Sequence, residues 1–282
     1  MIRGIDVSHH QGTVNWSILE SAYGLSWGAA KAYEGLHTPD SQFAANWRGM
    51  KAAGLVRMAY YFAHPDNDGA NAAKTFLSYV KPNGIDPTDI MVMDMEGNSN
   101  NLPMLAVNKW LSDWADTITA ETGRKPFIYT GSGYITNNAT RDVAKHYAAW
   151  WFPRYPSTYD GNTKWPTAIT GYPSPNNWGK APDIWQFSQS FGNRYDANIA
   201  DMTLSDLKTR GTIRLELPMT LDQGDKTYID QRLQAYSFWL DMRSARRELL
   251  FAQSNGTSAE GVAKAQQLYE EAYAAWKADQ AS

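Results

Sequence analysis

The strongest constraint on the fold is a regular alternation of short apolar runs with helix-like segments along the first half of the chain. The runs that we predict as β-strands are residues 2–6, 27–33, 55–63, 89–96, 126–130, 147–151, 167–171 and 183–187. Helix-like segments at 15–23, 40–53, 68–81 and 103–122 separate the first five runs. Alternation at roughly 30-residue spacing is typical of βαβ units in a parallel sheet. Eight such strands within about 200 residues predict a closed α/β barrel rather than an open sheet.

The connections change character after residue 130. They become rich in Pro, Gly and Asn and show little helical periodicity. Such segments favour turns and loops over helices. We therefore expect the second half of the barrel to be irregular and to lack some of its helices.

A further change follows the barrel, which we assign to residues 1–210. We predict a linker at 211–225 and a C-terminal helical hairpin of unknown role at 226–282. Thr257 followed by Glu260 has the spacing of a capping box, which predicts a second helix that runs to about residue 279. Its apolar stripe must be buried against something. We rank a brace on the barrel, or a homo-oligomer formed through these helices, slightly above a separate recognition module.

Composition excludes several classes of function. The 282 residues carry a net charge of −3, which gives no general attraction to nucleic acid. No run of about 18 apolar residues exists, so membrane insertion is not expected. Cysteine is absent, which excludes thiol nucleophiles and thiolate metal sites. The N-terminal stretch MIRGIDVSHHQG lacks the apolar segment of a secretory signal, and we expect synthesis in a cytoplasm without a signal peptide.

Two carboxylates, Asp94 and Glu96, end the apolar run DIMVMDME. Side chains two residues apart on a strand point to the same face, and the C-terminal ends of barrel strands carry active sites. Neighbouring carboxyls raise one pKa, which places an acid beside a base, as glycoside hydrolysis requires. The alternative is that the pair caps a loop or meets basic partners.

Other acidic residues fall at the same predicted edge of the barrel. Asp6 ends the first strand, Glu34 ends the second, and Asp196 follows the last. Each residue alone is a weak signal. Together they favour a barrel active site over scattered surface charge.

Competing chemistries lack their motifs. The five histidines show no HExxH spacing, no GxSxG elbow is present, and no glycine-rich phosphate loop follows a strand. The neighbouring His9 and His10 are better explained as loop structure or rim contacts than as a metal site. We therefore predict no metal and no cofactor.

The acidic residues belong to motifs that resemble glycoside hydrolase family 25, the lysozymes (N-acetylmuramidases) common among phage endolysins. The motifs are GIDVSHHQG at 4–12, KAYEG at 31–35, DMEG at 94–97, IWQFS at 184–188 and DAN at 196–198, and the likeness covers about residues 1–205. Their order and spacing match the family. Tyr33 and Tyr61 depart from the usual Thr and His, and these changes could alter the groove.

The resemblance implies a modified TIM-type (β/α)5(β)3 barrel that cleaves the β-1,4 bond between N-acetylmuramic acid and N-acetylglucosamine in bacterial peptidoglycan. Glu96 would be the general acid. Asp94 would orient the substrate acetamido group or stabilise the oxocarbenium-like centre, and Asp6 and Asp196 would complete the cluster. The residues that we expect to bind substrate are Glu34, Tyr60, Phe62, Trp151, Tyr155, Trp185 and Asn198. For the aromatic residues among them, barrel packing is an equally good explanation.

Three further points stay open. We favour retention of configuration by acetamido assistance over inversion by water. A non-catalytic glycan-binding or virion structural protein on the same barrel, or a chitin hydrolase, is the alternative function. A phage enzyme made in the host cytoplasm would reach the bacterial cell wall only after release by a separate protein.

Overall fold

A computed structural model describes residues 1–65, 68–98, 100–137, 141–174, 176–213 and 259–279. The chain divides into two compact units, Met1–Ile213 and Arg214–Ser282. The predicted linker begins close to this division, and most of it, with the first helix of the predicted hairpin, lies outside the described residues. Of the second unit, helix α9 (Ala259–Asp279) is described, and it corresponds to the second predicted helix.

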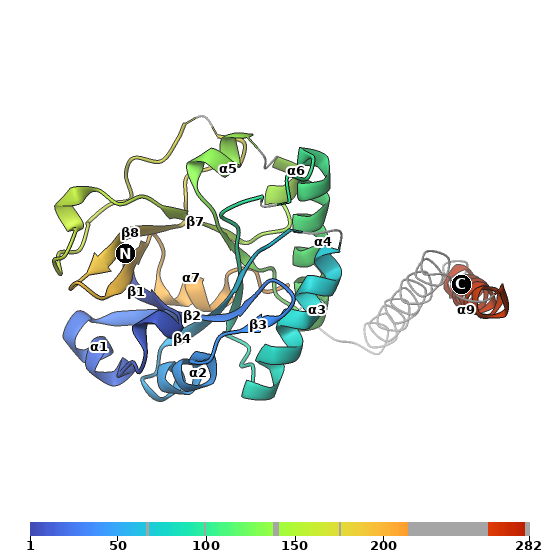
Figure 1. Ribbon diagram of the computed structural model, residues 1–282, viewed down its shortest axis with the longest axis horizontal. Helices are drawn as coiled ribbons and strands as arrows, with labels where there is room; N and C mark the ends of the chain where they lie inside the picture. Colours follow the sequence, from blue (N-terminus) through green and yellow to red (C-terminus); the bar gives the residue numbers. More distant parts are fainter. Residues whose placement is uncertain (66–67, 99, 138–140, 175, 214–258, 280–282) are drawn as a thin grey trace, which may run out of the picture. The chain divides into compact units, whose positions relative to one another are not determined.

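The first unit is a closed barrel (Figure 1). Its strands are β1 (Ile2–Val7), β2 (Leu25–Glu34), β4 (Val56–Phe62), β5 (Ile90–Asp94), β6 (Phe127–Tyr129), β7 (Ala149–Pro153), β8 (Ile184–Phe191) and β9 (Tyr195–Ala200). Neighbours from β1 through β8 pair in parallel, and the pairing of β1 with β2 closes the ring. A short strand β3 (Thr38–Pro39) pairs antiparallel with the end of β2. The predicted barrel architecture is confirmed.

Helices cover the outside of the first strands, as Figure 1 shows. They are α1 (Trp16–Tyr23), α2 (Phe43–Ala52), α3 (Gly69–Val80) and α4 (Met104–Thr122), all close to their predicted positions. Asn15 and Asp68 cap α1 and α3 by accepting backbone N–H groups with their side chains. Only the short helices α5 (Ser132–Asn137) and α6 (Arg141–Ala144) are described between β6 and β7, and none is described between β7 and β8 apart from a 3-10 turn.

One predicted strand is wrong. Residues 167–171 form no strand, because Pro166 and Pro173 flank them and Gly171 adopts a left-handed φ of 74°. The eighth strand is instead β9, which follows β8 through a turn with positive φ at Gly192 and Asn193. β9 runs antiparallel to both of its neighbours, β8 and β1, so the sheet is not wholly parallel.

Aromatic side chains fill the inside of the barrel. The rings of Trp27 and Trp151 meet edge to face with centroids 5.3 Å apart, and both residues are at most 2% exposed. A Cβ atom on Gly4 would lie 2.1 Å from the Trp27 ring, so only glycine fits at that position. The barrel is therefore a packed core that can support a site only at its ends.

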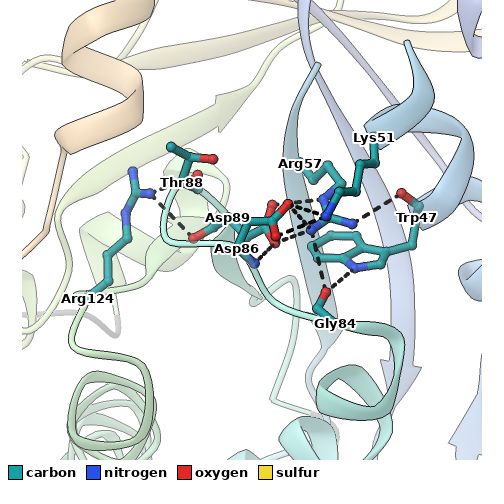
Figure 2. A network of polar contacts seen from close by, with 8 residues as sticks. All are labelled: Trp47, Lys51, Arg57, Gly84, Asp86, Thr88, Asp89 and Arg124. Carbon is teal, nitrogen blue, oxygen red and sulfur yellow. Dashed lines mark hydrogen bonds and ion pairs between the residues drawn. The ribbon is translucent and has the colours of Figure 1, made fainter. Parts of the chain in front are cut away.

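A buried ion pair joins the N-terminal ends of β4 and β5, at the edge opposite the predicted site (Figure 2). Arg57 is 3% exposed and donates from Nε and Nη2 to the carboxylate of Asp89. Its Cζ lies over the Trp47 ring, 4.1 Å from the ring centroid. Arg124 donates to the carbonyls of Thr88, Leu207 and Arg210. These contacts tie α7 (Leu204–Thr209) to the starts of β5 and β6, and Leu207 packs into the barrel interior.

Candidate active site

All four predicted catalytic carboxyls line one cavity of about 400 Å³. Asp6 and Asp94 lie at the C-terminal ends of β1 and β5, Glu96 lies two residues beyond Asp94, and Asp196 lies near the start of the antiparallel strand β9. The full lining is Asp6, Ser8, His10, Gln11, Lys31, Tyr60, Phe62, Val92, Asp94, Glu96, Tyr129, Trp151, Tyr155, Gln186, Gln189 and Asp196. Because β9 is antiparallel to β1 and β8, its N-terminal residues lie beside the C-terminal residues of the parallel strands.

Asp94 and Glu96 form a hydrogen-bonded pair with unequal access to solvent. Asp94 is 7% exposed, whereas Glu96 is open to the cavity. Burial, and then the negative charges of Glu96 and Asp6, raise the pKa of Asp94 well above its usual range. Desolvation also raises the pKa of Glu96, and the hydrogen bond that it accepts from Asp94 acts in the opposite direction. The pair thus retains a proton beside the carboxyl that faces the cavity.

Asp6 and Asp196 form a second carboxyl pair. They are directly opposite each other on β1 and β9. Burial raises the pKa of Asp6 to about 6, and hydrogen bonds from Asn198, Gln186 and Asp196 limit the rise. Burial and the charge of Asp6 raise the pKa of Asp196 to about 9. Asp196 therefore keeps its proton at neutral pH and donates it towards the carboxylate of Asp6.

Two buried amides hold the Asp6 carboxylate. Gln186 Nε2 donates to Oδ1 and Oδ2 at 3.1 and 2.9 Å, and Asn198 Nδ2 donates to Oδ2 at 2.7 Å. Asn198 is completely buried and accepts a hydrogen bond from Trp151 Nε1 at 2.8 Å. The structure thus places Asn198, predicted to bind substrate, behind Asp6 rather than in the cavity wall.

The predicted aromatic residues divide into two groups. Tyr60, Phe62, Trp151 and Tyr155 line the cavity. Trp185 does not; it is 1% exposed, and its Nε1 donates to the backbone carbonyl of Arg154 at 2.8 Å. Trp151 borders the cavity but is itself 2% exposed and packs on Trp27, so the rings best placed to meet the apolar face of a sugar are Tyr60, Phe62 and Tyr155.

Glu34 also lies outside the cavity lining. Its carboxylate pairs with Lys31, and its Oε1 lies 2.9 Å from His64 Nε2. These partners lower the pKa of Glu34. Lys31 itself lines the cavity, lies 4.7 Å from the centroid of the Phe62 ring, and lowers the pKa of Asp94 and Glu96 by its charge.

The residues at the two departures from the family pattern face away from the cavity. Tyr61 is completely buried and packs on Phe76 and Trp114 in the helical layer. Tyr33 packs on Tyr79 and donates to the carbonyl of Leu36 at 3.3 Å. Their change from Thr and His therefore does not reshape the cavity wall.

His9 and His10 lie in a single 3-10 turn that Ser8 caps. His9 Nδ1 lies 2.9 Å from the buried carboxylate of Asp40, while His10 lines the cavity. His9 is thus part of the loop structure and His10 lies at the rim of the cavity, as the sequence predicted. Within the parts of the chain that the structure describes, no group of three His, Asp or Glu side chains could hold a metal ion.

Sequence reasoning missed several residues of the cavity, chiefly Lys31, Tyr129 and Gln186. Lys31 and Gln186 lie inside the motifs KAYEG and IWQFS. These motifs could have indicated both residues, whereas a search for carboxylates alone could not. Tyr129 lies on the short strand β6, and only the pairing of β6 with β5 and β7 shows that it faces inward.

No helix among the described residues has the length and apolar character needed to cross a membrane. The mouth of the cavity is a separate matter. Glu96 and His10 are open to solvent, and Tyr155 is 36% exposed.

Comparisons with known proteins agree with this geometry. The sequence profile of Glycosyl hydrolases family 25 matches residues 5–193. Lysozyme M1 of Streptomyces globisporus is 32% identical over 188 residues, which are 60% of this chain and 63% of that protein. The N,O-diacetylmuramidase of Chalaropsis sp is 26% identical over 231 residues, which are 75% of this chain and 99% of that protein.

A solved structure shows the same fold. The bacterial lysozyme from Streptomyces coelicolor superposes with a TM-score of 0.61 at 27% identity, over 75% of this chain and 97% of that one. The profile match alone covers well over half of the chain. With its barrel and its carboxyl-lined cavity, the chain belongs to glycosyl hydrolase family 25.

Proposed function

We propose that the protein is a peptidoglycan hydrolase that cleaves the β-1,4 bond between N-acetylmuramic acid and N-acetylglucosamine. The observation that carries this proposal is the meeting of Asp6, Asp94, Glu96 and Asp196 in one cavity. Relatives named lysozyme and N,O-diacetylmuramidase support the choice of substrate.

Glu96 acts as the general acid in this proposal. It is the member of the Asp94–Glu96 pair that is open to the cavity, and the pair retains a proton because both pKa values are raised. The proton that the pair retains passes from Asp94 to Glu96 through their hydrogen bond, and Glu96 delivers it to the leaving oxygen, which leaves the pair ionised. The ionised Asp6 stabilises positive charge that develops on the sugar ring.

The nucleophile is best supplied by the substrate acetamido group. Asp94 is buried and its raised pKa favours the neutral form, which makes it a poor nucleophile, and Asp6 is held by three N–H···O contacts from Gln186 and Asn198. Acetamido assistance would retain the anomeric configuration. The configuration of the first product, observed by NMR, tests this part independently of the rate.

Release of reducing ends from purified peptidoglycan tests the proposed activity. The comparison uses wild type, Glu96→Gln, and Glu271→Gln as a matched control on an exposed position of α9. Muramic acid at the new reducing ends, found by mass spectrometry in wild type and control but not in Glu96→Gln, is the expected result. N-acetylglucosamine at the new ends, or no release from any wall type, would contradict it.

Two alternatives have their own outcomes in this experiment. Faster cleavage of chitin oligomers than of peptidoglycan would favour a chitin hydrolase. Binding to walls without release of any reducing end would favour a glycan-binding or virion structural protein. A role as a phage endolysin is a further proposal, tested by whether the protein lyses whole bacteria only after their membrane has been permeabilised.

A further inference from the structure

Gln186 lies between the Asp6 carboxylate and the hydroxyls of Tyr129 and Tyr155, and it hydrogen-bonds to both sides. On one side, its Nε2 lies 3.1 and 2.9 Å from the Asp6 carboxylate oxygens. On the other side, its Oε1 accepts hydrogen bonds from the hydroxyls of Tyr129 at 2.8 Å and Tyr155 at 2.5 Å. Gln186 is 4% exposed, so water cannot readily replace these partners.

The partners of Gln186 fix which way its amide points. A carboxylate only accepts hydrogen bonds, so the amide nitrogen must face Asp6 while Asp6 is ionised. The amide oxygen then faces the two tyrosines, and each hydroxyl can donate its proton to it. If Asp6 gained a proton, the amide could turn over, because tyrosine hydroxyls can also accept.

Asn198 supports the same charge state from the neighbouring strand. Gln186 on β8 and Asn198 on β9 are directly opposite each other. Asn198 donates to Asp6 Oδ2 at 2.7 Å, and the indole N–H of Trp151 fixes the orientation of its amide by donating to Oδ1. Asp6 thus accepts from two amides, both of which favour its ionised form.

We propose that Gln186 is a positioning residue of the active site, whose amide holds Asp6 as the ionised member of the Asp6–Asp196 pair and couples that charge to the hydroxyl orientation of Tyr129 and Tyr155. The catalytic importance of this arrangement rests on the proposed function, whereas the charge state of Asp6 does not. With Asp6 ionised, the proton of the pair lies on Asp196, and the sugar ring meets one negative charge on this side of the cavity.

Other titratable groups also face Asp6 and belong in the interpretation of any pH profile. From the elements around the cavity they are His10, Lys31, Tyr60, Asp94, Glu96, Tyr129, Tyr155 and Asp196. Glu96 raises the pKa of Asp6 by its charge, and Asp196 lowers it by its hydrogen bond. A direct titration of Asp6 is therefore needed besides the rate.

The experiment compares the full chain with Gln186→Met and Gln186→Glu. Methionine keeps the length of the side chain and removes both amide groups, whereas glutamate keeps the acceptor for the tyrosines and places an oxygen against Asp6. Gln267→Met and Gln267→Glu are matched controls at an exposed position of α9. The Asp6 carboxyl is followed by ¹³C NMR with labelled aspartate and assigned with Asp6→Asn.

We expect the Asp6 midpoint, near 6 in wild type, to rise by about one pH unit or more in Gln186→Met, and further in Gln186→Glu. The acidic limb of kcat/KM on peptidoglycan should move in the same direction, while the Gln267 variants match wild type. An unchanged Asp6 midpoint in a folded Gln186→Met protein would overturn the proposal, because a merely structural residue lowers stability without moving this titration.

A second variant keeps the test decisive if Gln186→Met does not fold. Tyr155→Phe removes one hydroxyl donor from Gln186 Oε1 at a partly exposed position, and it should raise the Asp6 midpoint by a smaller amount. No rise in Tyr155→Phe would then count against the coupling. Wild-type protein that lacks activity but titrates as expected would sink the proposed function and leave the role of Gln186 in setting the Asp6 charge intact.

Discussion

Asp6 and Asp196 oppose each other directly across the antiparallel pair β1–β9, so that a buried and a half-buried carboxyl share one proton. Like charges this close cannot both ionise without a large cost. Asp6 has the amide donors and Asp196 does not, which assigns the charge to Asp6 and the proton to Asp196. Ionisation of both carboxyls at high pH therefore lowers the stability of the folded state.

This pair predicts how stability depends on pH. The folded-state pKa values of about 6 and about 9 both exceed the usual value for Asp. A raised folded-state pKa gives stability that is complete below the unfolded-state pKa and is lost as pH rises through the folded value. The wild-type melting temperature should therefore fall between pH 5 and pH 9, which lies within the interval from the ordinary pKa of Asp, about 4, to the higher folded-state pKa of about 9.

Asp196→Asn should reduce that fall and also reduce activity, because asparagine supplies a donor to Asp6 without a titrating proton. Asp201→Asn, at an exposed position, is the control and should follow wild type. Melting temperatures at both pH values, with activity on peptidoglycan, check this prediction. A steeper decline in Asp196→Asn than in wild type would contradict the assigned proton.

Lys31→Met should move the pH optimum to higher values. Lys31 lowers the pKa of Asp94 and Glu96 by its charge, so its removal lets both pKa values rise. The basic limb of the rate profile, where the Asp94–Glu96 pair loses its proton, should shift upward. Lys164→Met removes a similar charge at an exposed position and should leave the profile unchanged. A downward shift in Lys31→Met would argue against Glu96 as the acid.

Gly4→Ala should destabilise the barrel by about 1–3 kcal/mol, a typical cost of overpacking. The new methyl group would lie 2.1 Å from the Trp27 ring, which Trp151 holds from another side. Denaturant unfolding gives the free energy. At Gly133 no atom lies within 4 Å of an added Cβ, so Gly133→Ala should cost nothing measurable. Equal effects of the two substitutions would show that the Trp27 packing is looser than described.

Arg57→Met should cost about 3–5 kcal/mol, because it leaves the Asp89 carboxylate buried and unpaired. Lys51→Met removes an exposed partner of the same network (Figure 2) and should cost no more than about 1 kcal/mol. The network lies at the end of the barrel opposite the cavity, so the specific activity of folded Arg57→Met should match wild type. Unfolding free energies and rates per folded molecule check both statements.

Strand and helix positions could be predicted from the sequence because they depend on local pattern. Seven strands and the four long helices lie close to the expected residues. β9 could not be predicted in this way, because its residues Asp196 and Asn198 turn polar groups inward. Residues 195–200 do alternate apolar and polar side chains, but it is the polar Asp196 and Asn198 that face Asp6, the reverse of the usual apolar inner face. Residues 167–171 lie between two prolines and form no strand.

The site divides in the same manner. The sequence by itself determined that Asp6, Asp94 and Glu96 gather at one end of a barrel, because each lies at or just beyond the C-terminal end of a strand and these ends share an edge. Asp196 joins them through the antiparallel pairing of β9 with β1. Only the tertiary structure decided that Glu34, Trp185 and Asn198 lie outside the cavity lining and that Lys31, Tyr129 and Gln186 belong to it. The physical reason is register. Gln186 and Asn198 reach Asp6 across 180 and 192 residues of chain, and the pairing of distant strands selects the face on which each side chain lies.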